Sequence, residues 1–325
     1  MKPLTFAILR LLSDNTFHSG EEMARRLGVS RASIWNALAS LETAGIALYR
    51  VRGRGYRLPH GMDWLDEKTV LSRLEGRAFP LHLEIHEQLP STNTALLARA
   101  QQGAPHGTCL AAECQTAGRG RRGRTWLSPI GGNLAFSLLW RFEQGAATLS
   151  GLSLAVGVAV LRALRQWDAA DIALKWPNDI LHQQRKLGGV LIELQGEAMG
   201  PSAAVIGVGL NLRLPESMRE HIGQPVSDLV SACLQRPSRS ILLGDLLAHL
   251  TAVLEKFQHG GFPSLRQEWE AHHAHQDRPV RLLFANGTAC EGTATGVGDD
   301  GALLLATPRG PLRFTSGEVS LREAP

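Results

Sequence analysis

Apolar residues recur at helical spacing in the first sixty positions and then give way to a short alternating stretch. From Leu4 to Leu12 they mark one face of a helix. Ser19 and Ser30 each precede a further helical pattern and are candidate N-caps, because a serine oxygen accepts a hydrogen bond from a free backbone N–H at a helix start. The alternating stretch at 48–58 contains a Gly-Arg-Gly tip, which predicts a β-hairpin. The predicted order is therefore three short helices followed by a hairpin.

The rest of the chain mixes helical and strand patterns. Helical apolar stripes lie at 64–76, 94–101, 152–167, 242–254 and 262–271. Strand-like runs lie at 81–87, 108–112, 133–140, 185–193 and 203–208, and short strands separated by turns begin at Arg278. This mixture predicts an α+β multidomain chain.

Length and charge narrow the class of protein and of partner. The 325 residues, 44% hydrophobic and 20% charged, suffice for two or three globular domains. Residues 1–60 hold nine Lys or Arg and four Asp or Glu, which gives a net charge of +5, whereas the whole chain carries +4. An anionic partner is therefore expected at the N-terminal module.

The sequence shows no pattern typical of secretion or of membrane insertion. No apolar run has the length of a membrane span, and Arg10 and Asp14 interrupt the apolar start of the chain. The four cysteines form no C-x-x-C pair, so we expect reduced thiols. We therefore expect a cytoplasmic protein with no membrane partner.

The first sixty residues resemble the winged helix-turn-helix of bacterial regulators. In that class the second helix of the motif reads base edges in the major groove. A winged helix used only for protein contacts is the alternative, and the charge of +5 favours DNA. The residues that the resemblance assigns to DNA are Arg31, Ser33 and Asn36 for bases and Ser30, Arg52 and Arg54 for phosphates.

Residues Gly118–Arg124, which read Gly-Arg-Gly-Arg-Arg-Gly-Arg, place four guanidiniums and three glycines in seven positions. Arginine presents a fork of N–H donors that matches phosphate and carboxylate oxygens, and glycine lets the backbone approach a ligand closely. A solvated basic loop or a nucleic-acid patch would have the same composition. The apolar strands on both sides, at 108–112 and 133–140, favour an active-site loop.

A second polar cluster lies at 175–179, which read Lys-Trp-Pro-Asn-Asp. Pro177 forbids a regular strand ladder, so we expect a bend that exposes the polar residues on either side at a strand end. Lysine occurs only five times in the chain, and Lys175 and Lys186 both belong to this region. The Gly-x-Gly at 207–209 is weak evidence for a dinucleotide site, because a third glycine and a following helix are missing.

Four motifs occur in the order seen in biotin–protein ligases. They are Gly118–Arg124, Lys175–Asp179, Arg185-Lys186-Leu187-Gly188-Gly189 and Gly207-Val208-Gly209-Leu210-Asn211. With the winged helix, nearly the whole chain resembles the bifunctional members that also repress the biotin operon. The resemblance implies a winged helix-turn-helix domain at 1–62, a class II synthetase-like α/β ligase domain with a mixed sheet at 63–275, and an SH3-like β-barrel at 276–325.

The resemblance implies a reaction in two steps. Biotin and ATP, with Mg²⁺, give biotinyl-5′-adenylate and pyrophosphate, and a lysine of the biotin carboxyl carrier protein of acetyl-CoA carboxylase then receives the biotinyl group. The resemblance also implies that the adenylate drives homodimerisation, and that the dimer binds operator DNA and represses biotin synthesis genes. The first step brings two anions together, which fixed cations make possible.

The resemblance assigns roles to individual residues. The catalytic group comprises Lys186, Arg121 and Asp179, with Lys186 at the junction of carboxylate and phosphate. Simple helix capping by Ser91-Thr92-Asn93 and a core position for Trp126 are the structural alternatives. The biotin side comprises Ser91, Thr92, Asn93, Gln115, Arg119, Gly120, Arg121 and Lys186, and the nucleotide side comprises Arg119, Arg121, Trp126, Lys175, Asn178, Asn211 and Arg322.

Several features leave alternatives open. The segment 215–235, which should lie on the adenine side, matches the family poorly. His272, His273 and His275 lack a matching carboxylate or cysteine set, so a surface cluster is favoured and no metal ligands are predicted. Two other functions remain: a non-catalytic DNA-binding regulator that senses biotin, and a lipoate–protein ligase with the same adenylation chemistry.

Overall fold

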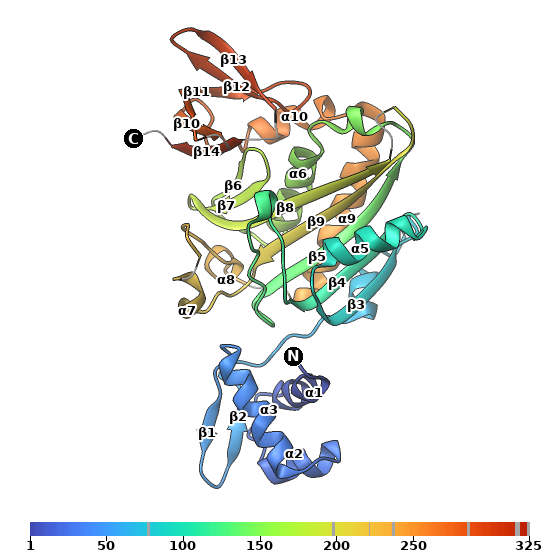
Figure 1. Cartoon of the computed structure of the whole chain (residues 1–325), viewed down its shortest axis with the longest axis vertical. Helices are drawn as coiled ribbons and strands as arrows, with labels where there is room; N and C mark the ends of the chain where they lie inside the picture. The colour runs from blue at the N-terminus through green and yellow to red at the C-terminus, as the bar shows by residue number, and fades with distance from the viewer. Residues whose placement is uncertain are drawn as a thin grey trace. The chain divides into compact units, whose positions relative to one another are not determined.

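The chain divides into two compact units in the computed structural model (Figure 1), Met1–Leu65 and Asp66–Pro325. The structure describes residues 1–76, 79–196, 199–220, 222–235, 238–284, 287–315 and 319–323, without the side chains of Ser217 and of 319–323. Within these ranges, no helix is both long and apolar enough to cross a membrane.

The first unit has the order of elements that the hydrophobic pattern predicts. Ser19 Oγ accepts a hydrogen bond from the Glu22 N–H at 3.0 Å, and Ser30 Oγ accepts one from the Ser33 N–H at 3.1 Å, so both serines cap helices as expected. The elements are α1 (Pro3–Leu12), α2 (Gly20–Leu27), α3 (Arg31–Thr43), β1 (Tyr49–Val51) and β2 (Gly55–Arg57). The winged helix-turn-helix is therefore confirmed.

A mixed sheet forms the centre of the second unit, and seven of its strands lie in the described ranges. In the order β3-β4-β5-β9-β8-β7-β6, only β3 and β4 pair in parallel. The register sets Lys175 opposite Asp179 and Asp179 opposite Gly189, so the lysine-bearing segment folds into a compact meander. The strands are β3 (His82–Leu89), β4 (Thr108–Gln115), β5 (Asn133–Phe142), β6 (Ile172–Lys175), β7 (Asp179–His182), β8 (Arg185–Gly196) and β9 (Ser202–Asn211).

Helices cover both faces of this sheet. Side chains of β5 alternate between the faces: Leu139 packs with α5 (Thr92–Gln101), whereas Trp140 Nε1 donates to Gln258 of α9 at 3.3 Å. Figure 1 shows α5 in front of the sheet and α6 and α9 behind it. The other helical elements are α4 (Glu67–Ser72), η1 (Arg121–Gly123), η2 (Ala146–Leu149), α6 (Leu152–Arg165), α7 (Glu216–Arg219), α8 (Leu229–Ala232), α9 (Arg239–Gly260) and α10 (Pro263–Glu270).

One predicted helix is shorter than the sequence pattern suggested. The stripe at 64–76 forms only α4, because the Asp66 carboxylate accepts the Thr69 N–H at 2.8 Å and fixes the helix start there. After Ser72 the chain continues in turns. Among the turns expected between the short strands that begin at Arg278, the one at Asn286-Gly287 lies partly outside the described residues.

A small antiparallel sheet ends the second unit, as the sequence predicts. Its described strands follow the order β13-β12-β11-β10-β14. The Trp176 indole N–H donates to the Gly301 carbonyl at 3.0 Å, which ties this sheet to the turn between β6 and β7. The strands are β10 (Pro279–Phe284), β11 (Ala289–Val297), β12 (Leu303–Thr307), β13 (Gly310–Phe314) and β14 (Val319–Glu323).

Candidate active site

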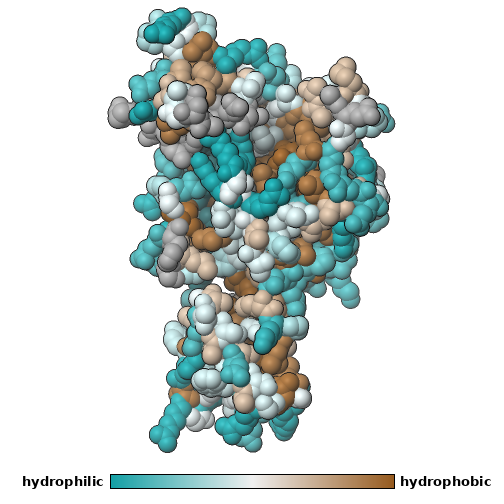
Figure 2. All heavy atoms as spheres, viewed as in Figure 1, coloured by the Kyte–Doolittle hydropathy of each residue, from teal (hydrophilic) through white to brown (hydrophobic). Residues whose placement is uncertain are grey.

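A cavity of about 720 Å³ is lined by the start of α5, the basic loop around η1, the turn between β6 and β7, residues 222–224 and Val226. On the face seen in Figure 2, hydrophilic side chains gather over the middle of the larger unit and border a strip of hydrophobic ones. Arg322, assigned to the nucleotide, has a side chain outside the described part of the chain. The other residues assigned to catalysis, biotin or nucleotide all line the cavity: Ser91, Thr92, Asn93, Gln115, Arg119, Gly120, Arg121, Trp126, Lys175, Asn178, Asp179, Lys186 and Asn211.

Polar groups at the start of α5 are tied to β4 and β5. Gln115 Oε1 accepts from the Thr92 N–H at 2.8 Å and from the Thr92 hydroxyl at 3.2 Å. Ser137 Oγ lies 2.6 Å from Asn93 Oδ1 and 2.7 Å from Thr92 Oγ1. Ser91 Oγ caps the helix and also faces the cavity, so capping and ligand contact are compatible at this position. The result is a fixed set of neutral donors and acceptors.

Glu193 and Ser137 belong to this network, although the sequence analysis did not single them out. Asn93 Nδ2 donates to Glu193 Oε2 and to the Leu191 carbonyl, both at 3.1 Å. Arg119 Nη2 donates to the other oxygen of the Glu193 carboxylate at 2.9 Å. Ser137 and Glu193 are each a polar side chain in a largely apolar strand, and this contrast is the signal that could have identified them.

The Gly-x-Gly of β9 provides space for neighbouring side chains. A Cβ atom at Gly207 would lie 2.0 Å from Asn93 Oδ1, and one at Gly209 would lie 2.7 Å from the Trp126 ring. Either atom would displace a residue of the cavity wall. The two glycines are therefore explained by steric demand, and this strand is not a dinucleotide-binding turn.

The basic loop turns one of its arginines inward. The Gly120 N–H donates to the Arg124 carbonyl at 2.7 Å, and Arg122 adopts a φ of 58° and is exposed. Arg121 instead donates through Nη1 to Asn178 Oδ1 at 3.0 Å. Burial, and then the nearby charge of Arg122, lowers the pKa of Arg121 below its ordinary value. The guanidinium nevertheless remains a cation at neutral pH.

Lys186 presents a second cation to the cavity. Its Nζ lies 2.6 Å from Asp179 Oδ1, and the two side chains are only 16% and 17% exposed. The same Nζ lies 6.0 Å from the centroid of the Trp126 ring. Trp126 is half-buried and lines the cavity, so it is a wall residue and not part of the core.

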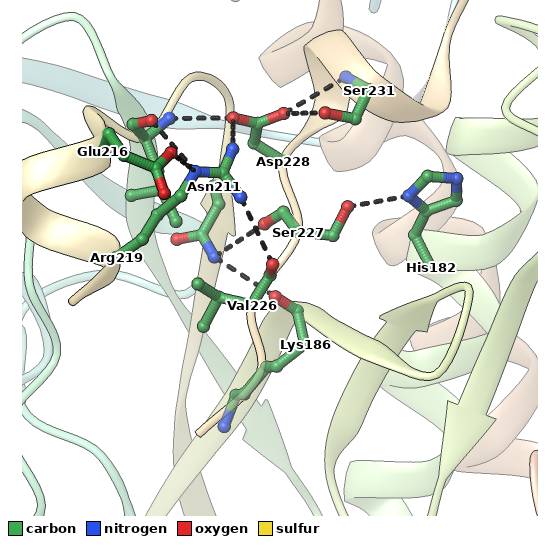
Figure 3. A network of polar contacts seen from close by, with 10 residues as sticks. His182, Lys186, Asn211, Glu216, Arg219, Val226, Ser227, Asp228 and Ser231 are labelled. Atoms are coloured by element: carbon green, nitrogen blue, oxygen red, sulfur yellow. Dashed lines mark hydrogen bonds and ion pairs between the residues drawn. The ribbon is translucent and has the colours of Figure 1, made fainter. Parts of the chain in front are cut away.

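The main chain of Lys186 is held by the segment 225–227. The Lys186 N–H donates to the Pro225 carbonyl at 3.0 Å, and the Ser227 N–H donates to the Lys186 carbonyl at 2.9 Å. Asn211 Nδ2 donates to the Ser227 carbonyl at 3.1 Å and lies 3.4 Å from the Lys186 carbonyl oxygen (Figure 3). The amide nitrogen of Asn211, a residue assigned to the nucleotide, thus also fixes the strand that carries Lys186.

In the first unit, the residues assigned to DNA lie at the surface or close to it. The Arg54 guanidinium stacks over the Phe17 ring, with 4.5 Å between its carbon and the ring centroid. Trp35 on α3 is 59% exposed, and the sequence analysis missed it because an aromatic residue in a helix usually belongs to the core. Arg31, Asn36, Arg52 and Arg54 are exposed, Ser33 is half-buried, and the exposed Ser30 uses its hydroxyl to cap α3.

Three family models match successive parts of the chain. The Biotin/lipoate A/B protein ligase family matches residues 85–211, which include the cavity residues from α5 to β9. An HTH domain matches residues 5–57, and the Biotin protein ligase C terminal domain matches residues 275–322.

Curated relatives cover nearly the whole chain. The Bifunctional ligase/repressor BirA of Salmonella typhimurium is 37% identical over 322 residues, which are 99% of this chain and 98% of the relative. The protein of the same name from Escherichia coli (strain K12) is 36% identical and covers 98% and 97%. The chain belongs to the bifunctional biotin ligase/repressor family.

A solved structure in this family shares the ligase fold. The biotin protein ligase from Aquifex aeolicus in complex with biotin and ATP superimposes with a TM-score of 0.64 at 30% identity, over 75% of this chain and 99% of that chain. The family membership thus agrees with the order of domains and with the cavity in the central sheet.

Proposed function

We propose that this chain is an ATP-dependent biotin–protein ligase that also represses transcription. The observation that carries the ligase activity is a single cavity with two chemically different parts. Neutral hydrogen-bonding groups surround Thr92, the Arg119–Glu193 ion pair lies beside Asn93, and the cations of Lys186 and Arg121 lie at the other part. A substrate with a polar ureido ring and a carboxylate tail, such as biotin, matches both parts.

In the first step, a carboxylate oxygen of biotin attacks the α-phosphorus of ATP, the bond to the β-phosphate breaks, and pyrophosphate leaves. Lys186 and Arg121 offset the negative charge that gathers as the two anions meet, and Asp179 orients the Lys186 amine. Because these cations are already held in place, little reorganisation accompanies the reaction.

Mg²⁺ neutralises part of the triphosphate charge in such reactions. The oxygens of Asp179 and Asn178 are hard donors of the kind that suits this ion. No group of three His, Cys, Asp or Glu gathers into a metal site anywhere in the described ranges. We propose that the ion enters the cavity bound to the phosphates of ATP.

In the second step, a lysine amine of the biotin carboxyl carrier protein of acetyl-CoA carboxylase attacks the acyl carbon of the adenylate. An amide bond forms, the bond to AMP breaks, and the attacking amine releases one proton. We propose that both steps occur in the cytoplasm, in a ligase domain at 63–275 that is flanked by domains at 1–62 and 276–325.

The repressor activity rests on the first unit. Arg31 and Asn36 on α3 and Arg52 and Arg54 on the wing are exposed cations and amides of the kind that contact bases and phosphates. We propose that the adenylate-bound chain forms a homodimer, and that the dimer binds operator DNA and represses biotin synthesis genes.

Pyrophosphate release from the full chain tests the ligase part. Release that requires both biotin and ATP supports the proposal. Release with lipoate in place of biotin would favour the lipoate ligase, and no release with either acid would favour a non-catalytic sensor. A gel shift with DNA from upstream of biotin synthesis genes, with and without both substrates, tests repression. An equal shift with and without the substrates would contradict adenylate-dependent repression.

A further inference from the structure

The segment from Leu214 to Asp228 is closed where its two ends meet (Figure 3). Arg219 of α7 pairs with the carboxylate of Asp228, whose side chain is only 4% exposed. Arg219 also donates to the carbonyls of Leu214 and Val226, both at 3.3 Å, and the Leu214 N–H donates to Asp228 at 2.9 Å. We refer to Arg219 and Asp228 as the clasp.

Asp228 joins three pieces of backbone at once. Besides Arg219 and Leu214, its carboxylate accepts the N–H and the hydroxyl of Ser231, at 3.1 and 2.7 Å, and so caps α8. A buried carboxylate with this many donors is held firmly, and removing its charge leaves the guanidinium without its counterion. The clasp therefore holds the segment at Leu214 and at Val226, on either side of residues 222–224.

The segment has two separate roles at the cavity. Ile222, Gly223 and Gln224 form part of the cavity wall. The neighbouring residue Ser227 pairs with Lys186 and has anchors of its own: its carbonyl accepts from Asn211, and its hydroxyl lies 2.7 Å from Nδ1 of the buried His182. The anchors at Ser227 do not involve the clasp.

Because the wall at 222–224 and the anchors at Ser227 use different contacts, breaking the clasp should affect the wall and leave the anchors in place. In Figure 3 the Lys186 side chain points away from the clasp, and its main chain has partners of its own at Pro225, Ser227 and Asn211. The network of Thr92, Asn93 and Gln115 is held by hydrogen bonds among α5, β4 and β5. The wall at 222–224, by contrast, has the clasp on both sides in sequence.

We propose that Arg219 and Asp228 are positioning residues that set the affinity for the nucleotide. They touch neither substrate and act through the wall at 222–224, which they hold against the phosphate and nucleoside side of the cavity. This inference rests on the proposed ligase function. The Arg219–Asp228 ion pair would thus give the segment 215–235, whose sequence matches the family poorly, a role in nucleotide binding.

The test is a comparison of steady-state constants for adenylate formation in the full chain. Asp228→Asn retains the volume and the oxygen that caps α8, but it loses the charge that pairs with Arg219. We expect the KM for ATP to rise about tenfold, while the KM for biotin and the kcat change by less than about twofold. Arg219→Gln should give the same result, and the double variant should be no worse, because the two residues act as a unit.

Glu216→Gln is the matched control. Glu216 Oε2 lies 3.6 Å from Arg219 Nε but is 84% exposed, so its loss should leave all three constants unchanged. A purely structural defect would lower the amount of active protein, and hence the apparent kcat, without raising the KM for ATP. Arg219→Ala provides a second readout: because Arg219 is 22% exposed, added guanidinium ion can reach the vacated position and should restore the KM for ATP.

The outcomes separate the two proposals. Wild-type protein that releases no pyrophosphate with biotin and ATP would overturn the ligase function. If the wild type is active, an unchanged KM for ATP in Asp228→Asn and Arg219→Gln would overturn the clasp, as would an equal rise in the KM for biotin. Should Asp228→Asn fail to fold, the guanidinium rescue of Arg219→Ala decides, and an absence of rescue counts against the clasp.

Discussion

The amine of Lys186 lies 2.6 Å from the carboxylate of Asp179, across the pairing of β7 with β8. Arg121 reaches the adjacent residue, Asn178, from the basic loop. Two cations that are far apart in the sequence therefore converge on one turn of the sheet, and each is oriented by a neighbouring oxygen. We therefore expect substitutions at both positions to impair adenylate formation.

Lys186→Ala should reduce the rate of adenylate formation by about two to three orders of magnitude, because a preorganised charge at the reacting atoms is removed. Biotin-dependent pyrophosphate release measures the effect, and circular dichroism checks that the fold is intact. A folded variant with a near-normal rate would show that Lys186 is not catalytic.

Arg121→Gly should release biotinyl-5′-adenylate into solution, because the inward cation that we expect to retain the intermediate is lost. A trapping assay for free adenylate measures the leak. Arg122→Gly is the control: Arg122 is exposed and has a φ of 58°, which glycine adopts without strain. Equal leakage from both variants would contradict a specific role for Arg121.

Gly207→Ala should raise the KM for biotin by about tenfold or more, since the added Cβ would lie 2.0 Å from Asn93 Oδ1 and would push that side chain from its place. The KM for ATP should change much less. Gly157→Ala on α6 is the control, because its Cβ would make only ordinary contact, at 3.4 Å, with Leu174. An unaltered KM for biotin in Gly207→Ala would mean that Asn93 does not face this ligand.

Trp35→Ala should weaken operator binding by about tenfold without changing the salt dependence, because an exposed aromatic contact is removed and no charge is lost. Arg52→Ala, by comparison, should reduce the slope of log affinity against log salt concentration by about 1, as expected for the loss of one phosphate contact. Titrations of operator DNA at several salt concentrations distinguish the two effects. A slope that changes in Trp35→Ala would contradict a base contact at this position.

Acid should destabilise the second unit through His273. Burial lowers the pKa of this imidazole to about 4, so the folded state binds fewer protons than the unfolded state between that value and the ordinary pKa near 6.5. The free energy of unfolding should therefore fall by about 2 kcal/mol between pH ~7 and pH ~5. Urea unfolding of the wild type and of His273→Gln measures it; the variant should lose correspondingly less, and an equal loss would exclude His273 as the cause.

Local chemistry made much of the fold predictable. Ser19 and Ser30 were identified as caps because the bond that a cap makes lies within one helical turn. The bend at Pro177 followed from a missing N–H, and it does separate β6 from β7. The ordered motifs then indicated which residues share a site, and those residues line one cavity wherever their side chains are described.

Partners across the sheet could not be predicted in the same way. Ser137 and Glu193 meet Asn93 only because β5, β9 and β8 are neighbours in that order, and nothing local in the sequence states this order. Arg219 and Asp228 carry no periodic pattern, so their pairing was equally invisible. Trp35 was missed for another reason: it is exposed, whereas an aromatic residue in a helix is usually buried.

The closure of the segment 214–228 has a consequence for engineering. The free-energy cost of closing a loop grows only with the logarithm of the loop's length, by about 0.6 kcal/mol for each doubling. Since the ends are joined by Leu214, Arg219 and Asp228, extra residues inserted after the exposed Glu220 would leave the sheet and its strand register intact. A peptide tag or a fluorescent reporter placed there would sit beside the cavity wall and outside the hydrogen bonds that hold Lys186.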